Sequence, residues 1–96
     1  MKTRDEILAS LGAAKAELQE RFQLRTLALF GSYVRKQQTE KSDVDILVEV
    51  DPSIGLGFVS LADELERRLQ QEVDLVSSRA VKSNRRRLIE PDLIHV

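Results

Sequence analysis

The fold and the chemistry of this chain depend on one stretch, Phe30-Gly-Ser-Tyr-Val-Arg-Lys-Gln-Gln-Thr-Glu-Lys-Ser-Asp-Val-Asp-Ile-Leu-Val-Glu-Val50. Gly31-Ser32 follows an apolar, strand-like segment at residues 24–30, and Asp43-Val44-Asp45 opens a second one at 43–50. A Gly-Ser turn that enters a short helix, predicted over residues 32–36, offers free backbone N–H groups and a hydroxyl to an anion. Two carboxylates two residues apart on a strand share a face, about 6.6 Å apart along the backbone, so both can reach one divalent cation or a close pair.

Two short motifs in this stretch resemble the signature of the minimal nucleotidyltransferases, small relatives of the DNA polymerase beta superfamily. That signature is Gly-Ser-x-x-Arg, a loop, and Ser-Asp-x-Asp before apolar residues. Here the first motif ends at Arg35, an exposed loop is predicted over residues 37–42, and Ser42-Asp43-Val44-Asp45 precedes Ile-Leu-Val. The resemblance extends over nearly the whole chain. One position departs from the pattern, because Lys36 stands where the family commonly has glycine.

The resemblance implies a set of site residues. Asp43, Asp45 and Asp74 would be the catalytic carboxylates and the ligands of Mg²⁺, with two ions expected. The triphosphate of ATP would be bound by the residues of the first motif, Gly31, Ser32 and Arg35. The chemistry of the residues agrees, because Mg²⁺ prefers oxygen ligands and crowded carboxylates repel one another unless a cation neutralises them.

Each of these residues also has an ordinary structural interpretation. The first two aspartates could be a turn residue and a solvated strand residue, and Asp74 lies in a Val-Asp-Leu-Val pattern that many half-exposed strands share. Arg35 could be a surface arginine or pair with one of the acids. The run Arg85-Arg86-Arg87 is interpreted as a solvated helix face, and Tyr33 is expected to pack against a helix rather than stack on a base.

Beyond the motifs, the pattern predicts an α/β (α+β) nucleotidyltransferase fold, a small mixed sheet with helices packed on it. Thr3 and Glu6 form a capping-box pattern that starts a first helix at about residue 4. Gly12, inside that helix, is interpreted as a site of close packing. A second helix is expected over about 56–71, a third strand over 72–77, a short basic helix ending near residue 90, and a terminal strand over 92–96.

Composition excludes several classes of protein. The chain has 96 residues, enough for a single domain (1–96), with 42% hydrophobic residues, no cysteine and a formal net charge of −1. This charge argues against a nucleic-acid-coating protein, which normally has a strong basic excess. No apolar run reaches the roughly 20 residues that span a bilayer, and no secretory signal opens the chain, so a cytoplasmic location is expected.

The resemblance also implies a partner and a reaction. Minimal nucleotidyltransferases are often paired with a small helical HEPN ribonuclease toxin, and the chain is expected to act as the antitoxin by moving AMP from ATP to a tyrosine hydroxyl of that toxin. Two alternatives stay open at this point. One is a catalytically weak antitoxin that acts by contact alone, and the other is a small-molecule nucleotidyltransferase whose site is completed in a homodimer.

Overall fold

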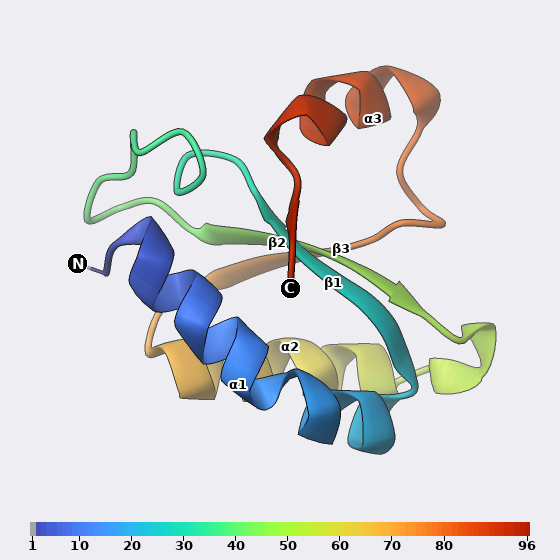
Figure 1. The fold of residues 1–96 in the computed structure, drawn as a ribbon. Helices are drawn as coiled ribbons and strands as arrows, with labels where there is room; N and C mark the ends of the chain where they lie inside the picture. Colours follow the sequence, from blue (N-terminus) through green and yellow to red (C-terminus); the bar gives the residue numbers. More distant parts are fainter. Residues whose placement is uncertain (1) are drawn as a thin grey trace.

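The computed structural model describes residues 2–96 as a four-stranded mixed sheet with helices on both faces (Figure 1). The strand order is β3 (Val73–Ser77), β2 (Val44–Val50), β1 (Leu24–Phe30) and β4 (Ile94–His95). β2 is parallel to β3, while β1 is antiparallel to both β2 and β4. The predicted fold class, a small mixed sheet covered by helices, is confirmed.

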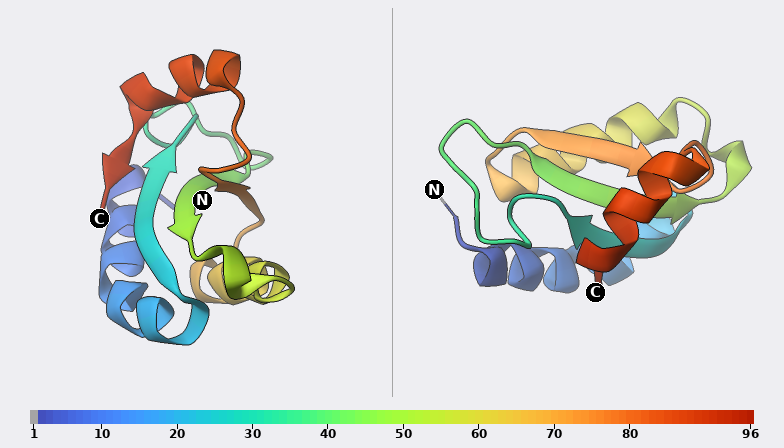
Figure 2. Two further views of the ribbon diagram at one scale, coloured as in Figure 1. Left: turned by 90° about the vertical axis from the view of Figure 1, so that its right-hand side faces the viewer. Right: turned by 90° about the horizontal axis from the view of Figure 1, so that it is seen from above.

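Two helices cover one face of the sheet, and a third lies on the other. α1 (Arg4–Phe22) and α2 (Gly57–Leu69) pack below the sheet in Figure 1, and α3 (Ser83–Ile89) lies above it. Seen from above, α3 crosses over the sheet (Figure 2, right). The loop that follows β1 rises on the same side of the sheet as α3. Within residues 2–96, none of the helices combines the length and the apolar character that a membrane span requires.

α1 begins as its capping box predicts. The Glu6 backbone N–H donates to the Thr3 hydroxyl at 3.2 Å, and the Thr3 N–H donates to the Glu6 carboxylate at 3.0 Å. The helix ends at Gln23, which has a left-handed backbone. Its buried side chains recur every three or four positions, so they form one stripe against the sheet. The stripe consists of Ile7, Leu11, Ala14, Leu18 and Phe22.

Alternation along β2 divides its side chains between two apolar clusters. Val44, Ile46 and Val48 are fully buried in the large cluster between the sheet and the two helices α1 and α2. Leu47 faces the other way and joins Phe30 and Ile89 in a small cluster beneath α3. Because side chains on a strand alternate between faces, Asp45 shares the face on which α3 lies.

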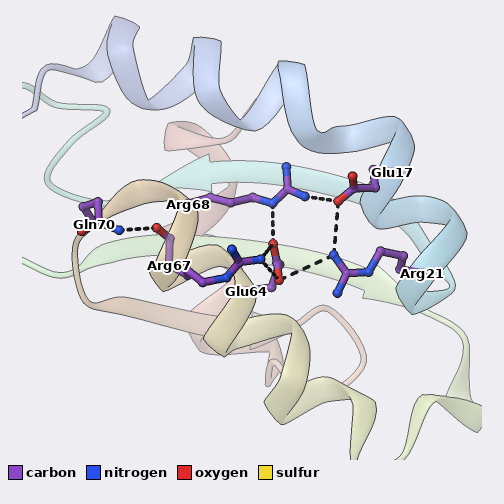
Figure 3. Close-up of polar contacts among 6 residues, drawn as sticks. All are labelled: Glu17, Arg21, Glu64, Arg67, Arg68 and Gln70. Atoms are coloured by element: carbon purple, nitrogen blue, oxygen red, sulfur yellow. Dashed lines mark hydrogen bonds and ion pairs between the residues drawn. The ribbon is translucent and has the colours of Figure 1, made fainter.

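A cluster of charged side chains also joins the C-terminal halves of α1 and α2 (Figure 3). Its centre is Glu64, whose side chain is 7% exposed and lies within ion-pair distance of three arginines. These arginines hold the pKa of the Glu64 carboxyl below its usual range, chiefly through the hydrogen bond from Arg67. Glu17 of α1 pairs with Arg21 and Arg68, so the cluster bridges both helices.

Two expectations from the sequence are wrong. Residues 32–36 form consecutive turns and not a short helix, because the N–H groups of Val34 and Arg35 both bond to the Gly31 carbonyl, at 3.1 and 3.2 Å. Lys36 then leaves helical geometry with φ of +58°. Gly12 is not a close-packing position, since it is exposed and a Cβ atom added there would meet nothing within 4 Å.

The remaining elements lie where the pattern predicts them, with shorter bounds. The second helix and third strand are α2 and β3, and two short 3₁₀ helices, η1 (Pro52–Ile54) and η2 (Glu90–Asp92), lie in the connections. The expected basic helix is α3, and the terminal strand is reduced to the two residues of β4.

Candidate functional site

Gly31 ends β1 in close contact with the Asp45 carboxylate. Its φ of +81° is a left-handed conformation that glycine adopts readily and other residues do not. A Cβ atom at this position would lie 2.1 Å from Oδ2 of Asp45 and 2.9 Å from its Cγ. The contact arises because Phe30 and Asp45 are cross-strand partners, which brings the residue after Phe30 over the carboxylate. Glycine is therefore required here for backbone conformation and for space.

The candidate acids come from two neighbouring strands. Asp45 and Asp74 are register partners in the parallel pair of β2 and β3, so their side chains project on the same face. Asp43 immediately precedes β2 and is exposed, as is Asp74, whereas Asp45 is half-buried. The structure thus places all three carboxylates at one end of the β2–β3 pair.

The three acids lie close enough for the charges of Asp43 and Asp74 to act on Asp45. The pKa of Asp45 is raised to about 6, first by burial and then by the negative charges of Asp74 and Asp43. The positive charges of Arg85 and Arg35 act in the opposite direction. Grouped carboxylates of this kind favour a nearby cation, which would neutralise their mutual repulsion.

The donor set fits Mg²⁺ in chemistry, because it consists of carboxylate oxygens. Within residues 2–96, however, no three Asp, Glu or His side chains converge as a complete ligand set. Asp74 instead points one carboxylate oxygen toward α3, where its Oδ2 lies 3.8 Å from Nη2 of Arg85.

The turn after Gly31 offers groups to an anion. Ser32 is half-buried, and in the described part of the chain neither its N–H nor that of Tyr33 donates a hydrogen bond. Arg35, further along the turn, forms an ion pair with Asp92 of η2 and not with any of the three acids. Tyr33 is fully buried beneath the turn, where its hydroxyl accepts from Nε2 of Gln71 at 2.6 Å, so the packing expected for Tyr33 is confirmed.

A polar hollow of about 380 Å³ adjoins Asp43 at the same edge of the sheet. The loop before β2 and the connection between α2 and β3 form its walls. Its lining residues are Glu40, Lys41, Ser42, Asp43, Gln70, Gln71 and Glu72. A hollow beside a candidate metal ligand gives a substrate room to approach.

Reasoning from the sequence missed two residues that contact this site, Arg85 and Asp92. The sequence predicts that Arg85 lies on a solvated helix face and that Asp92 begins the terminal strand, with no role for either in the site. Neither position carries a local motif. The available signal was the position of α3 after β3, which allows the helix to lie over the face that Asp74 shares.

Comparison with known proteins identifies the family of this chain. The family model described as polymerase beta, nucleotidyltransferase, matches residues 13–90. Protein adenylyltransferase MntA of Thermococcus cleftensis is 43% identical over 98 residues, which cover 100% of this chain and 98% of the relative.

Solved structures agree as well. One, provisionally named a minimal nucleotidyltransferase, has a TM-score of 0.81 and 28% identity over 97% of this chain and 95% of its own. A chain from a toxin–antitoxin crystal structure with AMP-PNP has a TM-score of 0.54 and 28% identity over 84% of this chain and 61% of its own. With its fold, its acids on paired strands and these relatives, the chain belongs to the polymerase beta nucleotidyltransferase family.

Proposed function

We propose that this chain transfers AMP from ATP to a hydroxyl group of a partner protein, with Mg²⁺ held by Asp43, Asp45 and Asp74. The observation that carries the proposal is the juxtaposition of Asp45 and Asp74 in register, with Gly31 packed directly on Asp45. This arrangement brings oxygen ligands for a cation next to a turn with unbonded N–H groups.

The proposed partner is a HEPN ribonuclease toxin, and the proposed acceptor is one of its tyrosines. Two findings support a protein acceptor within a toxin–antitoxin pair. The relative from Thermococcus cleftensis is named a protein adenylyltransferase, and one structural neighbour was solved as a toxin–antitoxin with the nucleotide analogue AMP-PNP. The HEPN assignment itself rests on the motif that runs from Gly31 to Asp45.

In the proposed reaction, the tyrosine oxygen attacks the α-phosphorus of ATP in line with the leaving group. A bond forms between that oxygen and phosphorus, the bond from phosphorus to the bridging oxygen breaks, and pyrophosphate leaves. Asp74 orients the attacking hydroxyl and accepts its proton. Two Mg²⁺ ions, when bound, supply charge neutralisation and lower the pKa of the hydroxyl.

The turn residues hold the triphosphate in this scheme. The N–H group and the hydroxyl of the half-buried Ser32 donate to phosphate oxygens, as at other anion-binding turns. Gly31 keeps the backbone close to the acids, so the turn would hold the phosphates beside the carboxylates that would bind the cations. Arg35 contributes positive charge, although part of that charge is already balanced by Asp92. Most of the rate then comes from positioning and electrostatic stabilisation.

The test is transfer of radiolabel from α-labelled ATP to the purified HEPN partner in the presence of Mg²⁺. Asp45→Asn and Asp74→Asn should each lower the transfer rate by about 10²-fold or more, because each removes a charge that the transition state requires. Glu49→Gln is the matched control, since Glu49 lies on the same face of β2 beyond the acids, and it should transfer label normally.

The same variants separate the proposal from its rivals. Equal labelling by the Asp45→Asn protein would refute the assignment of the acids. Neutralisation of the toxin by both aspartate variants, without any label, would indicate an antitoxin that acts by contact alone. Turnover of a small acceptor with no partner present would instead favour a small-molecule enzyme completed by a homodimer.

A further inference from the structure

The basic run of α3 is divided by the structure into three different environments. Arg86 is half-buried and donates from Nη2 to the Ser78 carbonyl at 2.6 Å, so it attaches α3 to the end of β3. Arg87 is exposed and forms no ion pair with any residue from 2 to 96. Only Arg85 reaches the candidate acids, with its Nη2 lying 3.8 Å from Oδ2 of Asp74. The run is therefore not a single basic surface.

Two arginines lie near the acids, and within residues 2–96 only Arg85 has one of those acids as its ion-pair partner. Arg35 and Arg85 are the two arginines whose charge counteracts the raised pKa of Asp45. Arg35 already has a carboxylate outside the acid set, Asp92, whose side chain is 19% exposed. Arg85 has no ion-pair partner within residues 2–96 other than Asp74, which is itself a proposed ligand of the cation.

We infer that Arg85 is a substrate-contacting residue that binds the phosphates of ATP, and that in the free chain Asp74 holds it in place. The inference rests on the proposed function and adds to it a residue outside the family motif. When Asp74 turns to the cation, the Arg85 guanidinium loses its counter-ion next to the site where the triphosphate is expected. A planar guanidinium donates two parallel hydrogen bonds to phosphate, and this one is 53% exposed and free to turn.

This exchange predicts that loss of the Arg85 charge affects the binding of a cation and the binding of a nucleotide differently. Without nucleotide, Arg85 competes with a divalent cation for Asp74, so removing its charge should leave cation affinity unchanged or raise it by about 2- to 5-fold, the range of an exposed ion pair. With nucleotide, removing the guanidinium deletes charge-assisted hydrogen bonds to phosphate, so affinity for ATP should fall about 10- to 100-fold. A purely structural role for Arg85 would not weaken ATP binding while leaving cation affinity unchanged or higher.

The experiment compares Arg85→Gln with Arg87→Gln, a matched control two residues further along the same helix. Mn²⁺ binding without nucleotide is measured by electron paramagnetic resonance, and binding of a fluorescent ATP analogue with Mg²⁺ by anisotropy. We expect Arg85→Gln alone to weaken nucleotide binding while keeping or increasing Mn²⁺ binding. Arg85→Lys keeps the positive charge but not the planar guanidinium with its paired donors, so it should bind nucleotide with intermediate affinity. This variant replaces Arg85→Gln in the comparison if Arg85→Gln does not fold.

The outcomes separate this inference from the proposed function. Equal nucleotide affinity in Arg85→Gln and Arg87→Gln, with a wild type that binds ATP and labels its partner, would overturn the inference and leave the function standing. Weaker Mn²⁺ binding in Arg85→Gln would overturn the exchange with Asp74. A wild type that binds ATP and Mn²⁺ but labels no partner would refute the proposed transfer, while the nucleotide affinities would still decide the role of Arg85.

Discussion

Replacing Gly31 with alanine forces a methyl group against the Asp45 carboxylate. Two costs follow from the structure. The φ of +81° is unfavourable for alanine by about 1–2 kcal/mol. The added Cβ would also lie 2.1 Å from Oδ2 of Asp45, so this carboxylate must move by more than an ångström, at about 0.5–1.5 kcal/mol for an off-rotamer side chain. We expect the free energy of unfolding in urea to fall by about 1.5–3.5 kcal/mol in total.

The loss of transfer should exceed the loss of stability. A displacement of this size in a group that positions the reaction costs about 10²-fold in rate. Gly55→Ala is the matched control, because Gly55 also has a positive φ of +53°, but a Cβ there meets its nearest atom, the Ser53 carbonyl oxygen, at 3.8 Å. Because Gly55 has ψ of −128°, outside the left-handed helical region, alanine there should lose about 1–3 kcal/mol of conformational energy and still transfer label normally.

A double-mutant cycle isolates the contact itself. In the background of Asp45→Ala the two closest atoms are gone, so Gly31→Ala should be less costly there by about 0.5–1.5 kcal/mol. Additivity within about 0.3–0.5 kcal/mol would show that Gly31 and Asp45 do not press on each other and would refute this reasoning. So would a Gly31→Ala protein that transfers label as fast as Gly55→Ala.

Three further predictions concern stability in urea. Gly12→Ala should stabilise the protein by about 1 kcal/mol, because Gly12 is exposed inside α1 with open space around it, and an unchanged midpoint would contradict this. Lys36→Gly should stabilise it by about 0.5–1 kcal/mol by relieving the positive φ, and a destabilised variant would show that the Lys36 side chain makes a compensating contact. Because the pKa of Asp45 is raised to about 6, the folded state holds this proton more tightly than the unfolded chain, so without divalent cations stability should fall as pH rises from about 4 to 6. Asp45→Asn should remove that part of the fall, which is measured by comparing both proteins at about pH 4 and about pH 7.

Features decided by near neighbours in the chain were predictable from the sequence. The capping box at Thr3, the stripe of α1 and the alternation of β2 all depend on residues within one or two turns or pleats. The opposition of Asp74 to Val73 and Leu75 follows from the same alternation, and the two apolar residues pack against the large cluster as expected. The fold class followed from the order of these elements.

Features decided by tertiary register were not predictable. The contact between Gly31 and Asp45 depends on how β1 aligns with β2, which no local pattern specifies. The ion pair of Arg85 with Asp74 depends on where α3 lies over the sheet. Residues 32–36 do not form the predicted helix because a segment of five residues can make too few helical hydrogen bonds. The roles of the six site residues remain predictions that the proposed variants test.

The Glu64 cluster has a practical consequence for any experiment on this protein in which the concentration of electrolyte is varied. Mobile ions screen exposed charges with a Debye length of about 10 Å at 0.1 M, and it shortens as electrolyte is added. Because the arginines around Glu64 are partly exposed, added electrolyte weakens the attachment of α1 to α2 as well as the binding of a nucleotide. A titration with potassium chloride therefore loosens the scaffold and the substrate together. Only substitutions made one charge at a time distinguish the two effects.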